Sequence, residues 1–240
     1  MSTQKRRERE RHARREQIVE AAKEVFGEKG FMAATAEEIA RRAEVAVGTL
    51  YLYFKSKEEM YVSLLFEGLD LFRQELERIQ GLPLRPDEKL RAFWDFLYTF
   101  YARYPAYYRI VSFLHTAGLR EAVSKDLLEE VKRRTGRNFS LAARIVRQGM
   151  MAGVYRPGDA REVVDFLWAL LTGLVQLMEI RRNLGLAVGD LAELHKNAFA
   201  LIEDGLSQPS RTAPRRRRRP LIRQAKVSRH TNVTKAAEES

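Results

Sequence analysis

Apolar side chains recur every three or four residues along nearly all of residues 16–206, and no segment shows the strict alternation of a half-buried strand. This spacing puts the apolar residues on one face of a helix. The pattern stops at glycine and proline, as at Gly30, Pro105 and Gly118, because these residues end helices. The sequence therefore predicts an all-α fold with helices over 16–29, 36–43, 47–53, 57–80, 87–103, 106–117, 121–151, 160–184 and 190–206.

The formal charge of +11 lies at the two ends of the chain. Residues 1–16 hold seven Lys or Arg against three Glu, and residues 207–240 hold ten against two, so the segment between them is nearly neutral. Basic ends are weaker evidence for nucleic-acid binding than a basic patch on a folded domain. We expect a basic N-terminal arm over 1–15 and a disordered basic tail over 207–240, where the helical periodicity is lost.

Several classes of protein are excluded by what the sequence lacks. It has no cysteine, so disulfides, thiolate nucleophiles and cysteine metal sites are absent. The longest apolar segment, 163–178, is interrupted by Asp165, Thr172 and Gln176 and does not reach the roughly 18 apolar residues of a membrane span. No apolar region follows the charged N-terminus as it would in a signal peptide. We expect a cytoplasmic protein with no membrane partner.

Two short segments near the N-terminus match the capping box that begins a helix. They are "TAEE" at Thr35–Glu38 and "SKEE" at Ser56–Glu59. Two short helices joined by a turn near Glu44 fit before the second box, which is the geometry of a helix-turn-helix. An ordinary helical hairpin is the alternative.

The second of these short helices begins at Val47 and has a distinctive outer face. Leu50 and Phe54 lie four residues apart and face inward. The residues that then face outward are Val47, Gly48, Thr49, Tyr51 and Leu52. An outward tyrosine can offer its hydroxyl to a phosphate and its ring to a thymine methyl. Gly48 lets the backbone approach DNA closely, and Lys57 adds a cation at the start of the next helix.

The segment "KEVFGEKGFMAATAEEIARRAEVAVGTLYLYFKSKEEMY" resembles the N-terminal domain of TetR/AcrR-family transcriptional regulators, over about residues 16–66. The resemblance implies a three-helix DNA-binding domain with its helix-turn-helix at about 36–55. It also implies a larger C-terminal helical domain for ligand binding and dimerisation, over 67–206. In that family the second helix of the motif enters the major groove of double-stranded operator DNA. The implied DNA contacts are Thr35, Val47, Gly48, Thr49, Tyr51, Leu52, Tyr53 and Lys57.

Three residues depart from the family pattern. Glu44 stands where a turn glycine is common and would cost on the order of 1 kcal/mol in a left-handed backbone. Ala46 stands where a hydroxyl usually caps the recognition helix, which forfeits roughly 0.5–2 kcal/mol. Ala36 removes a hydroxyl that could bind phosphate. Specificity is therefore expected to depend on thymine methyl contacts and DNA shape.

Ten of the 21 residues from Phe93 to Phe113 are aromatic. Core packing accounts for part of them, but buried tyrosines need polar partners, and a cavity that they line suits an apolar ligand with one polar end. Our first choice of effector is a long-chain acyl group, as a fatty acid or its coenzyme A thioester, with Arg103 or Arg109 near its anionic part. An aromatic or drug-like compound is the second. The predicted ligand residues are Trp94, Tyr98, Tyr101, Tyr104, Tyr107, Tyr108, Arg109, His115 and Trp168.

The sequence predicts no catalytic residues, metal ligands or cofactor, and we expect that the protein is not an enzyme. Its four histidines are scattered without metal-ligand spacing, and no GxSxG, GxGxxG or GxxxxGKS motif occurs. The predicted function is that of a ligand-responsive regulator, a repressor released from a palindromic operator by its effector. The alternative is a helical small-molecule-binding protein or enzyme whose helix-turn-helix is incidental.

Residues 160–184 carry apolar side chains in nearly every direction around the helix axis, so this helix must be covered on all sides. The last helix, over 190–206, covers only part of it. Two copies packed as a four-helix bundle would bury the rest and place two recognition helices on a palindrome. The homodimer is predicted to use Leu167, Leu171, Leu174, Met178, Leu194 and Leu201.

Overall fold

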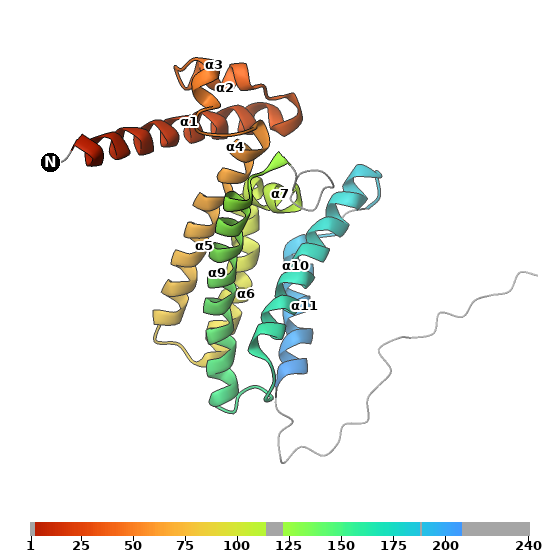
Figure 1. Ribbon diagram of the computed structural model, residues 1–240. Helices are drawn as coiled ribbons and strands as arrows, with labels where there is room; N and C mark the ends of the chain where they lie inside the picture. Colours follow the sequence, from red (N-terminus) through yellow and green to blue (C-terminus); the bar gives the residue numbers. More distant parts are fainter. Residues whose placement is uncertain (1–2, 114–121, 188, 208–240) are drawn as a thin grey trace, which may run out of the picture. The chain divides into compact units, whose positions relative to one another are not determined.

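The computed structural model describes residues 3–113, 122–187 and 189–207 (Figure 1). His115, the break at Gly118 and all of the basic tail beyond Ser207 lie outside these residues. Every regular element among the described residues is a helix, which confirms the all-α prediction. The helices are α1 (Thr3–Ala33), α2 (Ala36–Arg42), α3 (Val47–Leu50), α4 (Lys57–Ser63), α5 (Leu65–Gly81), α6 (Pro86–Arg103), α7 (Pro105–Phe113), α9 (Lys125–Met151), α10 (Ala160–Asn183) and α11 (Leu191–Leu206).

Helix α1 begins well before the predicted start at residue 16. Its first half is charged rather than apolar, and it is held by pairs one turn apart, such as the ion pair between Arg6 and Glu10 at 2.8 Å. Apolar periodicity cannot detect such a helix. The predicted break at Gly30 is confirmed, because this residue has φ 74° and ψ 167°, a backbone conformation that only glycine adopts readily.

The turn between α2 and α3 contains both departures that the sequence predicts to be costly. Glu44 has φ 52° and is the only non-glycine residue with positive φ within the described ranges. Ala46 is the N-cap of α3 and makes no side-chain capping bond. Helix α3 is a single turn, shorter than the predicted 47–53. The chain then returns inward through backbone bonds from Tyr53 and Phe54 to the Leu50 carbonyl, both at 3.0 Å.

Helices α4 and α5 replace the single helix that was predicted over 57–80. The hydrogen-bond ladder is interrupted at Leu64, but this residue keeps helical angles of φ −62° and ψ −25°. The two helices are therefore almost continuous. No glycine or proline marks the interruption, so sequence punctuation could not reveal it.

Two large apolar cores occupy the described part of the chain, and Val62 and Val123 form a third, small cluster. The first joins α1 to α4 around Ile18, Ile39 and Leu50, each 0% exposed. The second joins α5, α6, α9, α10 and α11 around Trp94, Ile145 and other buried side chains. Helix α7 contributes to both, because Tyr107 and Ile110 belong to the first core and Tyr108 to the second.

Helix α10 is long and apolar enough to cross a membrane if length and composition alone are considered. Its place in the fold explains this composition, because one side of it packs within the second core. The other side carries Phe166 and Ile180, which are 64% and 55% exposed. An all-round apolar helix thus has one face covered by its own chain and one face open.

Candidate DNA-binding and ligand-binding sites

The outer surface of α3 and the turn after it carries large side chains that the fold leaves exposed. Tyr51 is 50% and Leu52 is 74% exposed, whereas Leu50 and Phe54 are 0% and 2% exposed. This is the predicted division between an inward and an outward side. Of the other residues predicted to contact DNA on this surface, Thr35 and Gly48 are exposed, and Val47, Thr49 and Tyr53 are half-buried.

Thr35 begins α2 with a complete capping box. Its hydroxyl accepts from the Glu38 backbone N–H at 3.2 Å, and its own N–H donates to the Glu38 carboxylate at 3.2 Å. Both bonds lie within the helix start and leave the threonine side chain at the surface. The predicted cap is confirmed, and a phosphate contact by Thr35 stays a prediction.

The Lys57 side chain is turned toward the protein. Its ammonium donates to the carbonyl oxygens of Phe31 and Ala34, at 3.0 and 2.9 Å, and lies 4.5 Å from the centre of the Phe31 ring. These contacts tie α4 to the end of α1 and use two of the three ammonium donors. Nothing in the sequence signals this structural role, and the phosphate contact predicted for Lys57 stays a prediction.

Two other cations lie near the motif and were not predicted as contacts. Arg41 in α2 and Lys55 before α4 are exposed, and neither side chain makes a hydrogen bond or ion pair within the described residues. Both are free to meet phosphates, which supply most of the affinity of a protein for DNA. Their exposure could have been inferred from their positions in the helical pattern.

The second capping segment is connected to a distant helix. Ser56 caps α4 by accepting from the Glu59 N–H at 3.1 Å, as predicted, but the Glu59 carboxylate does not reach back to Ser56. It accepts instead from the N–H of Lys55 at 2.8 Å and from the N–H of Ser124, the N-cap of α9, at 2.9 Å. Burial disfavours the charged carboxylate, but the bonds from Ser124 and Lys55 outweigh it and lower the pKa of Glu59.

The Ser56 hydroxyl adds a second bond to the same region by donating to the Ala122 carbonyl at 2.8 Å. The start of α4, directly after the helix-turn-helix, is therefore bonded to the start of α9 through the side chains of Ser56 and Glu59. This link joins residues more than sixty positions apart in the sequence, and no local pattern signals it.

An aromatic cavity of about 60 Å³ lies among α5, α6, α7 and α10. Four of the predicted ligand residues line it, and it is almost wholly apolar. Gly68 and Leu69 form its wall on α5. The predicted residues that the structure brings together here are Tyr101, Tyr107, Tyr108 and Trp168.

A second, larger groove of about 600 Å³ lies between the end of α1 and the start of α7. Tyr104 and Arg109 of the predicted set line it, together with Arg103. Tyr107 lines both this groove and the aromatic cavity. The predicted set is therefore divided between two adjoining spaces that share one tyrosine.

Trp94 and Tyr98 belong to neither space. Trp94 is 0% exposed and packs in the second core, where its indole N–H donates to the His195 carbonyl at 3.0 Å. The Tyr98 ring lies 5.0 Å from the His195 ring. These residues join α6 to α11. The full burial of Trp94 corrects its assignment as a ligand contact, and the assignment of Tyr98 stays a prediction. Metal-ligating groups of three or more His, Asp or Glu side chains do not occur among the described residues.

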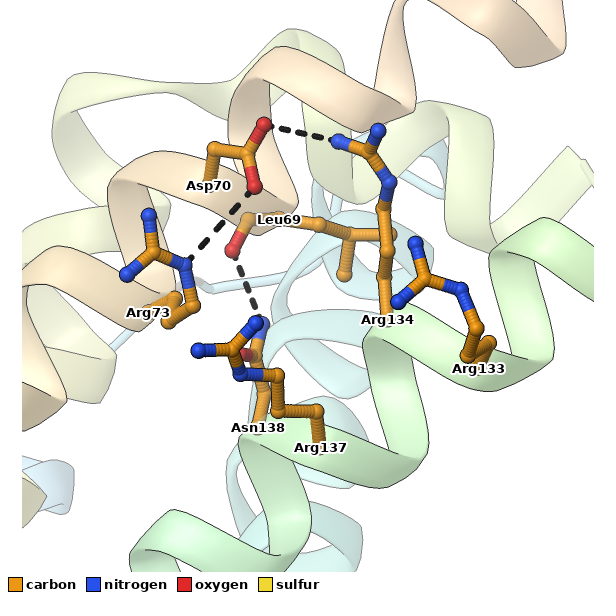
Figure 2. A pocket seen from close by; sticks show the side chains of 7 residues that line it. All are labelled: Leu69, Asp70, Arg73, Arg133, Arg134, Arg137 and Asn138. Carbon is orange, nitrogen blue, oxygen red and sulfur yellow. Dashed lines mark hydrogen bonds and ion pairs between the residues drawn. The ribbon is translucent and has the colours of Figure 1, made fainter.

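A polar pocket of about 310 Å³ lies between α5 and α9 (Figure 2). We call it the arginine pocket, because four guanidinium groups line it. Sequence reasoning missed it, since its members come from two helices and carry no motif. Its lining residues are Leu69, Asp70, Arg73, Arg133, Arg134, Arg137 and Asn138.

The residues predicted for dimerisation divide into two sets. Leu167, Leu171 and Met178 are 0%, 2% and 5% exposed within their own chain, and the first two belong to its second core. Their placement on an interface is therefore corrected. Leu174 and Leu194 are half-buried, and Leu201 is 65% exposed. The open side of α10 instead carries Phe166, Leu177 and Ile180, which are 64%, 42% and 55% exposed and share one face of the helix.

Comparisons with known proteins agree with this architecture. Residues 18–64 match the family described as "Bacterial regulatory proteins, tetR family". The chain is 31% identical over 164 residues to the HTH-type transcriptional regulator HbdR of Aromatoleum sp. (strain CIB), covering 65% of this chain and 69% of that protein. It is 44% identical over 61 residues to the fatty acid metabolism regulator protein of Bacillus subtilis (strain 168), covering 25% of this chain and 31% of that protein.

A solved structure shows the same fold over most of the chain. It is the transcriptional regulator FadR from Bacillus subtilis in complex with stearoyl-CoA, which superposes with a TM-score of 0.61 at 23% identity, over 79% of this chain and 98% of that one. The helix-turn-helix, the helical C-terminal part and the extended similarity to HbdR lead to one conclusion. The chain belongs to the TetR family of bacterial regulatory proteins and is a helix-turn-helix transcriptional regulator.

Proposed function

We propose that this chain is a repressor that binds a palindromic operator as a homodimer and releases it when a long-chain acyl-coenzyme A binds. The observation that carries the proposal is the position of Tyr107. Its ring is packed in the core of the DNA-binding helices and also forms a wall of the aromatic cavity. A ligand that enlarges this cavity therefore acts on the core beneath the recognition helix.

The cavity must enlarge before it can hold an effector. Its volume is about 60 Å³, whereas pockets for small molecules measure roughly 300–1,000 Å³. Tyr107 cannot move toward α5, because its ring lies against Gly68 so closely that a Cβ there would be 2.5 Å from the ring. A ligand that pushes on the Tyr107 ring therefore moves α7 as a whole.

A polar link adds to this coupling. Burial, and then hydrogen bonding with Glu67, raise the pKa of Tyr107, so its hydroxyl stays protonated at neutral pH. The Glu67 carboxylate also pairs with the Lys23 ammonium of α1 at 2.9 Å. Movement of α7 thus changes contacts to α1 as well as to the shared core. An effector that binds the moved state more tightly favours it by that difference in affinity.

An acyl chain suits the cavity because the wall is aromatic and aliphatic, and the cavity adjoins guanidinium groups that suit an anionic end. The stearoyl-CoA complex of the similar FadR structure supports the same class of effector. The open face of α10 supports the homodimer. We further propose that the protein acts in the cytoplasm and has no catalytic activity.

The test is fluorescence anisotropy of the full chain on DNA from upstream of its own gene, titrated with palmitoyl-CoA, palmitic acid or coenzyme A. We expect a discrete complex below micromolar protein, and a rise in its Kd of roughly 5- to 150-fold with palmitoyl-CoA, the usual range of allosteric coupling. Failure to form a discrete complex would contradict the repressor. An unchanged Kd with all three compounds would contradict the effector class and leave DNA binding standing.

A further inference from the structure

The arginine pocket has more positive than negative groups. Figure 2 shows the Asp70 carboxylate between Arg73 and Arg134, with Arg137 beside Asn138. Asp70 accepts from Arg134 at 2.7 Å and lies 3.9 Å from the Nε of Arg73. Two nearby glutamates, Glu77 and Glu130, complete the pairing. Four guanidinium groups thus share three carboxylates.

The guanidinium donors are unevenly used. Glu130 accepts two bonds from Arg133 and one from Arg134, at 2.6–2.8 Å. Arg137 is different, because its nearest carboxylate oxygen, on Glu77, is 3.8 Å away and it makes no hydrogen bond with a described residue. A guanidinium carries five N–H donors in a planar fork, so Arg137 offers a complete fork to a ligand.

This arrangement suits a multiply charged phosphate ligand better than a carboxylate. A single negative charge would gain little beside three carboxylates already present. A diphosphate brings several charged oxygens at the spacing that guanidinium forks bind with two parallel bonds. The half-exposed arginines at the rim, Arg133 and Arg137, can rotate toward such a group, since their side chains are 63% and 57% exposed.

The arginine pocket shares one lining residue with each of two apolar spaces in the interior. Leu69 lines both the arginine pocket and the aromatic cavity. Asn138, only 3% exposed, lines the arginine pocket and a small gap beside Phe72 and Trp168. The two are joined by a bond from the Asn138 side-chain amide to the Leu69 carbonyl, at 2.9 Å. We call this pair the partition.

We propose that the arginine pocket holds the phosphate-bearing end of the effector, and that its acyl chain crosses the partition between Leu69 and Asn138 into the aromatic cavity. This inference rests on the proposed function and assigns the two ends of the ligand to two named places. It also gives α9 a part in the response. Three of the four arginines are on α9, and Glu59 of α4 accepts from both Ser124, the N-cap of α9, and Lys55, at the end of the helix-turn-helix.

The test is isothermal titration calorimetry of the full chain with palmitoyl-CoA, palmitic acid and coenzyme A. The variants are Arg137→Gln and Asp70→Asn, with Arg144→Gln as the matched control, because Arg144 is an exposed α9 arginine that does not line the pocket. We expect Arg137→Gln to weaken binding of palmitoyl-CoA and of coenzyme A roughly tenfold or more, the effect of losing charge-assisted bonds. Asp70→Asn should tighten both, because it removes the central opposing charge.

Palmitic acid has no phosphate, so its affinity should be the same in all four proteins, and Arg144→Gln should match wild type throughout. If wild type binds palmitoyl-CoA and Arg137→Gln binds it equally well, the pocket assignment is overturned and the effector class stands. If wild type does not bind palmitoyl-CoA, the effector class fails. In that case coenzyme A alone tests the pocket. Weaker binding of coenzyme A to Arg137→Gln than to wild type would support the pocket as a phosphate site, and equal binding of coenzyme A to the two proteins would overturn it.

Discussion

Trp94 and His195 exchange hydrogen bonds with each other's backbone. The Trp94 indole N–H donates to the His195 carbonyl at 3.0 Å, and the His195 Nε2 lies 3.0 Å from the Trp94 carbonyl oxygen. Their rings are stacked, with centres 4.5 Å apart and planes 4° apart. A carbonyl oxygen only accepts, so Nε2 carries the proton. The pair fastens α11 to α6 in the second core.

This pair predicts a loss of stability in mild acid. Burial lowers the pKa of His195 below its ordinary value of 6.5, against smaller opposing effects of Trp94 and Asp95. The unfolded chain therefore binds a proton more readily than the folded chain. The stabilisation is complete above about pH 6.5 and is lost as the pH falls toward the lower folded value.

We expect the melting temperature of wild type to drop as the pH falls from about 7 to 5.5. Over the same pH range, the melting temperature of His195→Gln should drop less. Differential scanning calorimetry at half-unit steps measures both. The variant should also melt lower at pH 7, because glutamine does not reproduce the stacked pair. Parallel pH profiles for the two proteins would show that His195 is not the titrating group.

The contact between Gly68 and Tyr107 predicts opposite effects for two glycine substitutions. A Cβ at Gly68 would lie 2.5 Å from the Tyr107 ring, whereas a Cβ at Gly136 on α9 would have no atom within 4 Å. Gly68→Ala should cost about 1–3 kcal/mol of unfolding free energy through overpacking. Gly136→Ala should gain up to about 1 kcal/mol from helix propensity. Urea unfolding compares them, and a stabilised Gly68→Ala would mean that α7 moves aside without cost.

Local sequence rules predicted the parts of this fold that depend on neighbouring residues. The Thr35 capping box, the break at Gly30 and the uncapped Ala46 are all as the sequence indicates. The charged start of α1 was missed, because a helix held by ion pairs has no apolar period. The interruption at Leu64 was missed because it carries no glycine or proline.

The left-handed backbone at Glu44 predicts a stabilising substitution. With φ at 52°, a residue with a Cβ lowers the free energy of unfolding by roughly 1–2 kcal/mol, and glycine removes this strain. Glycine also makes the unfolded chain more flexible, which lowers the free energy of unfolding by about 0.4–1 kcal/mol. Glu44→Gly should therefore raise the unfolding free energy by up to about 1 kcal/mol. Glu44→Ala keeps the Cβ and is the control, expected near wild type. Equal denaturation midpoints for Glu44→Gly and Glu44→Ala would show that the strain at this residue does not exceed the entropy cost of glycine.

The outward tyrosine and the inward lysine predict separable effects on DNA binding. Tyr51→Phe removes only a hydroxyl from a half-exposed ring, so it should weaken operator binding at an unchanged melting temperature. Lys57→Met should lower the melting temperature, because it removes two bonds to the Phe31 and Ala34 carbonyls. Leu50→Ala should cost about 2–5 kcal/mol of stability. Fluorescence anisotropy and thermal melts on the same samples separate the effect on DNA affinity from the effect on stability. If Tyr51→Phe binds the operator as tightly as wild type, the Tyr51 hydroxyl does not contact DNA.

The sites were harder to predict than the fold, because tertiary contacts decide them. Lys57 has the spacing of a phosphate contact, yet two carbonyls at the end of α1 bind its ammonium. The arginine pocket combines Arg73 with Arg137, which are far apart in sequence and share no motif. On α10, an apolar pattern in every direction gives no inner side, so Leu171 was placed outward although it is buried.

The open face of α10 predicts a homodimer that one charge can prevent. Phe166 and Ile180 are 64% and 55% exposed and lie on the same stripe as Leu177, which is 42% exposed. Apolar faces of this kind mark interfaces, and covering it with a second copy would pair two recognition helices on two half-sites. Wild type should scatter light as about twice the 27.8 kDa chain. Ile180→Glu should give monomers that lose the operator, whereas Met151→Glu, a charge at an 83% exposed residue of α9, should remain dimeric and bound. A wild-type monomer that still protects both half-sites of a palindrome would contradict this assembly.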